Sequence, residues 1–271
     1  MLTTSRLFAF SLLATLASAL PANFTERTPE LGDLTEDEAL SLVERATRTP
    51  VYSQCTTANT VAITFDDGPY IWNTDIVDTL NANNAKGTFF VNGNNYECIY
   101  SSENEQRLKT AYNAGHQIAS HTWAHLDWTK LSKEKLMSEM TRVDTALTKI
   151  LGVKPAFVRP PYGNYNTASR EVAAENGQDI VIWDFDSGDS TGASVEESEK
   201  AYDNVANENP PTILTLNHET YETTAHQVLP YALNALKKKG YTFVTVAECL
   251  GGMNPYAETT TPEERDSTWR C

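Results

Sequence analysis

Two adjacent carboxylates, Asp66 and Asp67, stand at the end of an apolar run. Residues 61–65 predict a buried strand, and Gly68 and Pro69 end it. Successive side chains of a strand point in opposite directions, so one aspartate can bind a cation while the other faces a substrate. Two carboxylates in contact raise the pKa of one of them unless a metal ion or an arginine compensates. The pair indicates metal-assisted or base-catalysed chemistry, with a solvated turn as the alternative.

Two histidines four residues apart supply ligands for such a cation. His121 and His125, in the sequence HTWAH, would face one direction on a helical turn. Two histidines and one carboxylate around an open position form the donor set of a catalytic divalent-metal site, Zn²⁺ most simply. Two other histidines, His116 and His226, show no acidic or histidine partner in register, and we expect structural or surface roles for them.

A stiff loop, RPPYG, follows another predicted strand. Its two prolines restrict the backbone and lack N–H groups, so Tyr162 offers the first free main-chain donor after the strand. A preorganised N–H of this kind suits a developing oxyanion. Arg159 is placed to lie against a strand-end aspartate and to keep it ionised and oriented. An ordinary loop is the alternative interpretation.

A further histidine, His218, ends a late predicted strand. Its imidazole can protonate a leaving amine if a partner holds its tautomer and keeps it charged. Asp186, in the sequence DFDSGD, is the natural partner, and Leu216 is placed to line an apolar pocket for a methyl group. A lone strand-end histidine is more often structural, so this assignment depends on the other motifs.

Short apolar runs alternate with helical patterns from residue 55 onward. Predicted strands cover residues 61–65, 87–91, 117–120, 157–159, 179–184, 212–217 and 242–245, and predicted helices cover 74–83, 103–114, 132–151, 168–176, 195–206 and 226–239. This α/β alternation implies a parallel sheet, either a (β/α) barrel or an open doubly wound sheet. Every polar cluster above lies at a predicted strand C-terminus, where both architectures place active sites.

The ends of the chain predict export. Residues 1–19 have the charge, the short apolar core and the A-x-A site of a secretory signal, and no later segment approaches ~20 apolar residues. Residues 20–50 are polar and form either a removed pro-region or an N-terminal arm, with a glycosylation sequon at Asn23. The main domain then spans residues 51–250, and residues 251–271 form a C-terminal tail. We expect a secreted, soluble monomer, extracellular or associated with the cell wall.

Four cysteines in an exported chain predict two disulfides. Three connectivities exist, and we favour Cys55–Cys249, which joins the first ordered segment to the last and leaves Cys98–Cys271 to tether the tail. The net charge of −15 argues against nucleic acid and membrane surfaces as partners. It is compatible with a neutral or cationic polymer, or with a role in solubility alone.

In chain order, TFDDGP, HTxxH, RPPYG, DSxD and LxH resemble the five motifs of the NodB-homology polysaccharide deacetylases, carbohydrate esterase family 4. The resemblance covers about residues 55–250, and residues 89–95 with the secretory start are similar to fungal chitin deacetylases. It implies a distorted (β/α) barrel. It also implies metal-dependent hydrolysis of N-acetyl groups from N-acetylglucosamine units of chitin or chitooligosaccharides, giving chitosan and acetate.

The resemblance also implies a role for each motif residue. Asp66 would be the general base, oriented by Arg159, and Tyr162 would supply the oxyanion N–H. Asp67, His121 and His125 would bind the divalent ion, Zn²⁺ or another such as Co²⁺. His218 would be the acid, with Asp186 setting its charge state.

One position departs from the family pattern. The fourth motif usually closes with a tryptophan, and this chain has Ser190 there. The sequence therefore does not predict the shape of the pocket wall at this position. Trp123 and Trp183 stand in neighbouring motifs, and we do not assign either of them to the place of the missing tryptophan. Three alternative functions remain: an acetylxylan esterase with the same metal centre, a peptidoglycan deacetylase, and a catalytically inactive carbohydrate-binding barrel.

Overall fold

The computed structural model describes residues 48–271, and residues 49–271 form one compact unit. The predicted signal segment, Asn23 and nearly all of the segment 20–50 lie outside the described residues. Within the described part of the chain, no helix has the length and apolar character needed to cross a membrane.

A parallel sheet of nine strands forms the centre of this unit. Its strands are β1 (Val51–Tyr52), β2 (Thr60–Gly68), β3 (Gly87–Val91), β4 (Gln117–Ser120), β6 (Phe157–Val158), β7 (Asp179–Val181), β8 (Phe185–Asp186), β9 (Thr212–Leu216) and β10 (Thr242–Phe243). They lie in the order β1-β7-β6-β4-β3-β2-β9-β8, and β10 also pairs with β2. Consecutive strands are mostly neighbours, which is the winding of a barrel and not of a doubly wound sheet. No pairing among the described strands joins β8 to β1, so the curled sheet stays open.

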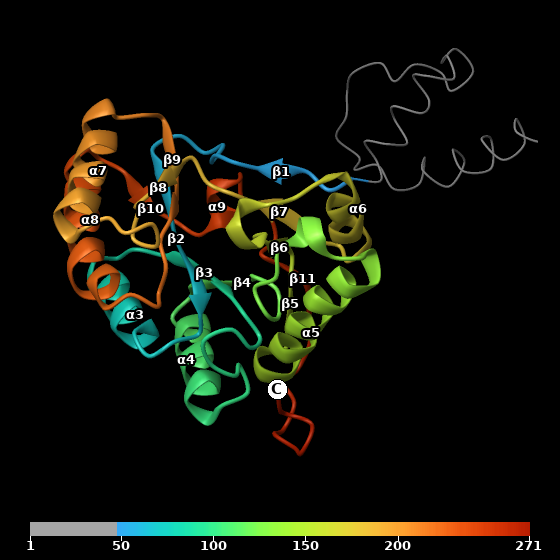
Figure 1. Ribbon diagram of the computed structural model, residues 1–271. Helices are drawn as coiled ribbons and strands as arrows, with labels where there is room; N and C mark the ends of the chain where they lie inside the picture. Colours follow the sequence, from blue (N-terminus) through green and yellow to red (C-terminus); the bar gives the residue numbers. More distant parts are fainter. Residues whose placement is uncertain (1–47) are drawn as a thin grey trace, which may run out of the picture. The chain divides into compact units, whose positions relative to one another are not determined.

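Helices cover the outside of the curled sheet (Figure 1). They are α3 (Asn73–Ala82), α4 (Ser102–Asn113), α5 (Lys133–Leu151), α6 (Thr167–Glu175), α7 (Val195–Glu208) and α8 (Leu229–Lys238). Around the sheet, α7, α8, α3, α4, α5 and α6 are neighbours in that order. The side chains of Ser101, Ser132 and Ser194 cap α4, α5 and α7, because each accepts a hydrogen bond from a free amide of the first turn.

Alternation along the strands separates two apolar layers. On β2, Val61, Ile63 and Phe65 belong to the large cluster that packs under the helices. Ala62 belongs to a second cluster, which includes interior positions of β3, β4, β7 and β9 and the short helix α9 (Val246–Cys249). Asp66 stands four residues after Ala62 and therefore shares its side of the sheet. The strand pattern alone places this carboxylate inside the curl.

Several short elements escaped the sequence patterns. They are β5 (Val153–Pro155), α9, β11 (Tyr256–Thr259) and the 3₁₀ turns Trp128–Lys130 and Pro161–Gly163. The strand expected over residues 179–184 ends at Val181, and β8 follows it separately. The helix expected from His226 begins at Leu229, after a π-helical turn over Thr224–Val228. Runs of two to five residues carry too few positions for a hydrophobic period to appear.

The C-terminal segment is part of the folded unit, which extends to Cys271 and not only to residue 250. Strand β11 pairs antiparallel with β5, and the Trp269 side chain is buried with its ring 5.7 Å from that of Tyr100. Both predicted disulfides are confirmed: Cys55–Cys249 has a Cα–Cα distance of 5.0 Å and Cys98–Cys271 one of 5.9 Å.

We expect Trp269→Ala to lower the free energy of unfolding by about 3 kcal/mol, because it opens a cavity between the tail and the core. Arg270→Ala is the matched control, since Arg270 is exposed, and it should change stability by less than about 0.5 kcal/mol. Urea unfolding of both variants with oxidised disulfides measures the difference. Equal stabilities would show that the tail is not part of the cooperative unit.

Candidate active site

The predicted functional residues gather around one cavity of about 460 Å³. Its lining is Asp66, Asp67, His121, His125, Pro160, Tyr162, Trp183, Asp186, Ser190, Thr191, Leu216 and His218. These residues come from at or just after the C-terminal ends of β2, β4, β6, β7, β8 and β9. The volume is in the range of pockets that hold a small organic group or one sugar unit.

Asp66 and Arg159 form a buried ion pair at the bottom of the site. Arg159 Nη1 donates a hydrogen bond to Asp66 Oδ1 at 2.8 Å, and the exposed fractions of the two residues are 0% and 2%. The same guanidinium donates to the hydroxyl of Thr64 and to two backbone carbonyls, one in the last residue of β7 and one in the residue that follows it. Burial raises the pKa of Asp66 above its usual range, and the charge of Arg159 opposes part of that rise. The predicted contact between Arg159 and a strand-end aspartate is confirmed.

Asp67, His121 and His125 present one ligand atom each, all within 4.8 Å of one another. Asp67 Oδ1 lies 3.4 Å from His125 Nε2 and 3.7 Å from His121 Nε2. Burial lowers the pKa of both histidines, which favours the neutral imidazoles that ligate metals. One carboxylate and two imidazoles at this spacing fit a divalent cation with open coordination positions.

The histidine pair converges through a non-helical turn and not through the predicted helical turn. Thr122 and His125 have φ values of 65° and 53°, so the chain reverses in the left-handed region. His121 Nδ1 lies 2.8 Å from the carbonyl oxygen of Arg159, which makes Nδ1 the protonated nitrogen and leaves Nε2 free to face Asp67. Asp67 itself has a φ of 73°, which ends the strand alternation, and its carboxylate lies near His121, as does that of Asp66.

Asp189, and not Asp186, is the partner of His218. The Asp189 carboxylate accepts the Nδ1–H of His218 at 2.7 Å, and its other oxygen accepts the His218 amide and the hydroxyl of Thr224. Asp186 is exposed at the cavity wall, and its carboxylate accepts the amide of Gly188. Sequence reasoning chose the first aspartate of DSGD, but a turn at Gly188 brings the second one back over His218.

This pairing controls the charge of His218. Burial opposes the imidazolium, but the hydrogen bond and charge of Asp189, with the charges of Asp66 and Asp67, outweigh it and raise the pKa of His218 to about 9. His218 is therefore protonated at neutral pH and can donate from Nε2 into the cavity.

Part of the cavity wall consists of apolar and aromatic groups. Leu216 is 5% exposed, and the Tyr162 ring contacts that of His125 at 4.7 Å between centroids. The amides of Gly163 and Asn164 donate back into the loop, which leaves the Tyr162 amide as the donor to consider for a bound oxygen. Trp183 lines the same cavity, whereas Trp123 is buried elsewhere under Gly93. Ser190 lines the cavity where the family usually has a tryptophan, and its small side chain is exposed.

Glu219 was missed by the sequence patterns although it follows His218 directly. Its carboxylate accepts the amide of Tyr70 at 2.6 Å and the side chain of Asn73, and its own amide donates to the Asp66 carbonyl. A Cβ on Gly68 would lie 2.0 Å from the Glu219 carboxyl carbon, so only glycine fits beside it. Burial raises the pKa of Glu219 to about 8. Its chain position next to the histidine motif was the available signal.

The two remaining histidines have partners of their own. His116 is buried and its Nδ1 accepts the Gly87 amide at 3.1 Å, which fits the expected structural role. His226 lies on the surface, which fits the expected surface role, and its Nε2 is 2.8 Å from Asp75 Oδ2. The expectation of no acidic partner in register was wrong, because Glu222, four residues earlier, lies 3.8 Å from its Nδ1. Neither residue lines the cavity.

Comparisons with known proteins agree with this geometry. The family model described as polysaccharide deacetylase matches residues 53–181. A chitin deacetylase from Pestalotiopsis sp is 35% identical over 222 residues, which cover 79% of this chain and 72% of that protein. The chain belongs to the polysaccharide deacetylase family. The resemblance drawn from the five motifs is confirmed.

One further relative and one solved structure are also similar to this chain. A probable peptidoglycan-N-acetylglucosamine deacetylase from Arthroderma benhamiae is 36% identical over 218 residues, which span 78% of this chain but only 48% of that protein. The solved chitin deacetylase of the fungal pathogen Colletotrichum lindemuthianum has a TM-score of 0.74 and 31% identity, over 79% of this chain and 96% of that one. This match confirms the distorted (β/α) barrel.

We expect Asp189→Asn to lower the pKa of His218 from about 9 toward the ordinary histidine value of 6.5, because the carboxylate charge that favours the imidazolium is lost. Asp186→Asn is the control and should leave that pKa in place. NMR titration of the His218 imidazole in the metal-free protein measures both. The assignment is overturned if Asp186→Asn shifts the titration and Asp189→Asn does not.

Proposed function

We propose that the protein hydrolyses N-acetyl groups of N-acetylglucosamine units in chitin or chitooligosaccharides. The observation that carries the proposal is the Asp67–His121–His125 donor set beside the Asp66–Arg159 pair and across one cavity from the His218–Asp189 pair. A cation site, a base and an acid are the parts that amide hydrolysis requires. Relatives named chitin deacetylases support chitin as the substrate.

Zn²⁺ is the metal that the donor set favours, with Co²⁺ as a substitute of similar coordination. Asp67, His121 and His125 would hold it. When bound, the ion supplies a Lewis acid that polarises the acetamide carbonyl and lowers the pKa of water.

Asp66 is placed to act as the general base. Its Oδ1 is held by Arg159, so its Oδ2, 3.8 Å from His121 Nε2, is the oxygen that can take a proton from the attacking water. Burial raises the pKa of Asp66, which makes the carboxylate a stronger base than an exposed aspartate. The fixed guanidinium keeps that carboxylate in one orientation throughout the reaction.

His218 and Tyr162 act on the other side of the scissile amide. The Tyr162 amide would donate to the oxygen that gains charge as the carbonyl carbon becomes tetrahedral. His218, kept protonated by Asp189, would give its Nε2 proton to the sugar nitrogen as the C–N bond breaks. Leu216 is placed to contact the acetyl methyl group, and acetate and a free amine are the products.

Peptidoglycan and acetylated xylan are alternative substrates to be tested beside chitin. The 36% identity to a probable peptidoglycan-N-acetylglucosamine deacetylase favours peptidoglycan as a second candidate, because the reacting acetamide is the same. Acetylated xylan is the third. The leaving group of an ester is an alkoxide, which needs less help from a general acid than the amine of an amide does. A protonated His218 therefore favours an amide substrate.

We also propose that the protein is exported and acts as a monomer on the polymer outside the cell. The two disulfides support export, because such bonds persist in oxidising compartments. The net charge of −15 makes nucleic acid and anionic membranes poor partners.

We expect acetate release from a chitooligosaccharide series to stop when a chelator removes the metal and to return when Zn²⁺ is added. Parallel assays with peptidoglycan fragments and acetylated xylan decide the substrate class. Acetate from xylan alone would overturn the amide proposal. Full activity in metal-free protein, checked by elemental analysis, would overturn the metal.

We expect Asp66→Asn to lower kcat at least about 100-fold while the bound metal stays stoichiometric, because the base is lost and the three ligands remain. Measuring turnover and metal content on the same sample separates the two effects. Near-normal turnover in the metal-loaded variant would show that Asp66 is not the base.

A further inference from the structure

We infer that the surface loop of residues 93–99, called the brace loop below, positions the metal ligand Asp67 through the side chain of Asn95. We further infer that the disulfide to the C-terminal residue keeps this loop in place. The inference rests on the metal centre proposed above. It concerns positioning residues, because neither Asn95 nor the disulfide lines the reaction cavity.

Asn95 contacts the ligand oxygen itself. Its Nδ2 donates to Asp67 Oδ1 at 3.2 Å, and this is the oxygen that faces His121 and His125. A carboxylate oxygen has two lone pairs, so it can accept this hydrogen bond and still face a cation. Hydrogen bonds to a ligating carboxylate fix its orientation and tune metal affinity.

A second asparagine links this contact to the histidine ligands. Asn92 Oδ1 accepts a hydrogen bond from Asn95 Nδ2 at 3.2 Å. Asn92 Nδ2 donates to the carbonyls of His121 and Thr122 at 2.6 and 2.9 Å. A continuous chain of hydrogen bonds therefore runs from Asp67, through the two asparagines, to the turn that carries the histidines.

The base of the brace loop has little freedom. The Gly93 amide donates to the Thr122 carbonyl, and the Ile99 amide donates to the Gly93 carbonyl at 2.8 Å. A Cβ on Gly93 would lie 2.0 Å from the Trp123 ring, so the loop packs directly on that indole. The first residue of the loop is thus held against the histidine turn, and the last residue is held to the first.

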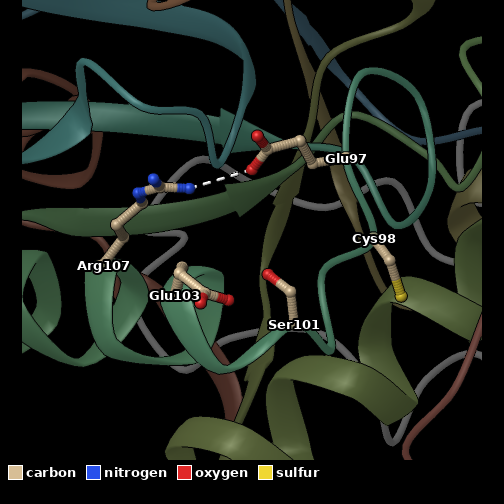
Figure 2. Close-up of a pocket in the computed structure, with 5 residues that line it drawn as sticks. All are labelled: Glu97, Cys98, Ser101, Glu103 and Arg107. Carbon is tan, nitrogen blue, oxygen red and sulfur yellow. Dashed lines mark hydrogen bonds and ion pairs between the residues drawn. The ribbon is translucent and has the colours of Figure 1, made fainter.

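Helix α4 holds the outer side of the loop (Figure 2). In Figure 2, Arg107 of α4 points to Glu97 of the loop, and the ion pair between them measures 2.9 Å. The same Arg107 nitrogen donates to Asn104 Oδ1, and Asn104 Nδ2 donates to the carbonyl of Cys98 at 3.0 Å. These contacts hold the Glu97 side chain and the backbone at Cys98.

The C-terminus provides the covalent part of the brace. Cys98, the last residue but one of the loop, is bonded to Cys271, whose Sγ lies 3.5 Å from the Gly93 carbonyl oxygen. Two residues before Cys271, the Trp269 ring is buried against Tyr100, and Arg265 donates to the Tyr100 carbonyl. The tail thus contacts both ends of the loop that carries Asn95.

The energetic consequence is a weaker metal site when the brace is broken. The three ligands would remain, but Asp67 would lose the donor that orients it, and the loop would gain conformational freedom that metal binding must then remove. Losing an outer hydrogen bond of this kind lowers metal affinity by about 10- to 100-fold.

The test measures Zn²⁺ affinity of the full chain by competition with a chelator, together with the visible spectrum of the Co²⁺ form. We expect Asn95→Ala to weaken Zn²⁺ binding about 10-fold and to change the Co²⁺ spectrum, since the geometry of Asp67 changes. Asn94→Ala is the matched control: Asn94 is exposed, and its side chain has no hydrogen-bond partner among the described residues.

The disulfide is tested by a pair of double variants. Cys98→Ser with Cys271→Ser should weaken Zn²⁺ binding, whereas Cys55→Ser with Cys249→Ser removes the other disulfide and should leave the affinity near that of the native chain. If a double variant fails to fold, Asn95→Ala against Asn94→Ala decides the inference.

The outcomes separate the brace from the proposed function. If the native chain binds no Zn²⁺, the metal centre itself is wrong and the brace falls with it. If the native chain binds Zn²⁺ and His125→Ala abolishes binding, but Asn95→Ala and Asn94→Ala have the same affinity and spectrum, the brace alone is overturned.

Discussion

The buried guanidinium of Arg159 is the interaction on which the rest of the site depends. Its Nη1 donates a hydrogen bond to Asp66 Oδ1 at 2.8 Å, and its Cζ lies over the Phe90 ring, 4.1 Å from the ring centroid. Its main-chain carbonyl fixes the tautomer of His121. One residue therefore orients both Asp66, the proposed base, and His121, a proposed metal ligand. Removing one partner of a fully buried ion pair leaves an uncompensated charge, at a cost of about 3–5 kcal/mol.

Backbone strain is concentrated around this centre. Among the described residues, seven non-glycine residues have positive φ values, and four of them (Asp67, Thr122, His125 and Tyr162) lie in the site. Such conformations cost about 1 kcal/mol or more each and persist only where the surroundings enforce them. Here the hydrogen bonds of Arg159, Asn92 and Asn95 and the packing of Glu219 on Gly68 supply that enforcement. The strained turns bring side chains together that regular strands and helices would direct apart.

The charged groups of the site form two buried ion pairs, and the candidate cation site lines the same cavity. Asp66 faces Arg159, Asp189 faces His218, and Asp67 is left to face the two histidines that burial keeps neutral. Arg159 opposes the rise that burial causes in the pKa of Asp66, the proposed base, and Asp189 raises the pKa of His218, the proposed acid, to about 9. Because the two groups have separate partners, one small cavity can contain a proposed base and a proposed acid at the same pH.

The sequence by itself determined the longer elements and most of the residues that meet in the site. The strand 61–65, the strands 87–91 and 117–120 and the long helix up to Leu151 were readable because alternation and a 3.6-residue period extend over enough residues. Residue type and order predicted the contact of Arg159 with a strand-end aspartate and both disulfides, and the resemblance to the family singled out Asp67, His121 and His125 as the proposed metal ligands. Tertiary structure alone decided that Asp189 and not Asp186 meets His218, that a left-handed turn and not a helix joins His121 to His125, and that Asn95 and Glu219 support the site. These choices depend on single loop residues and on contacts between distant segments, and neither leaves a periodic signal in the chain.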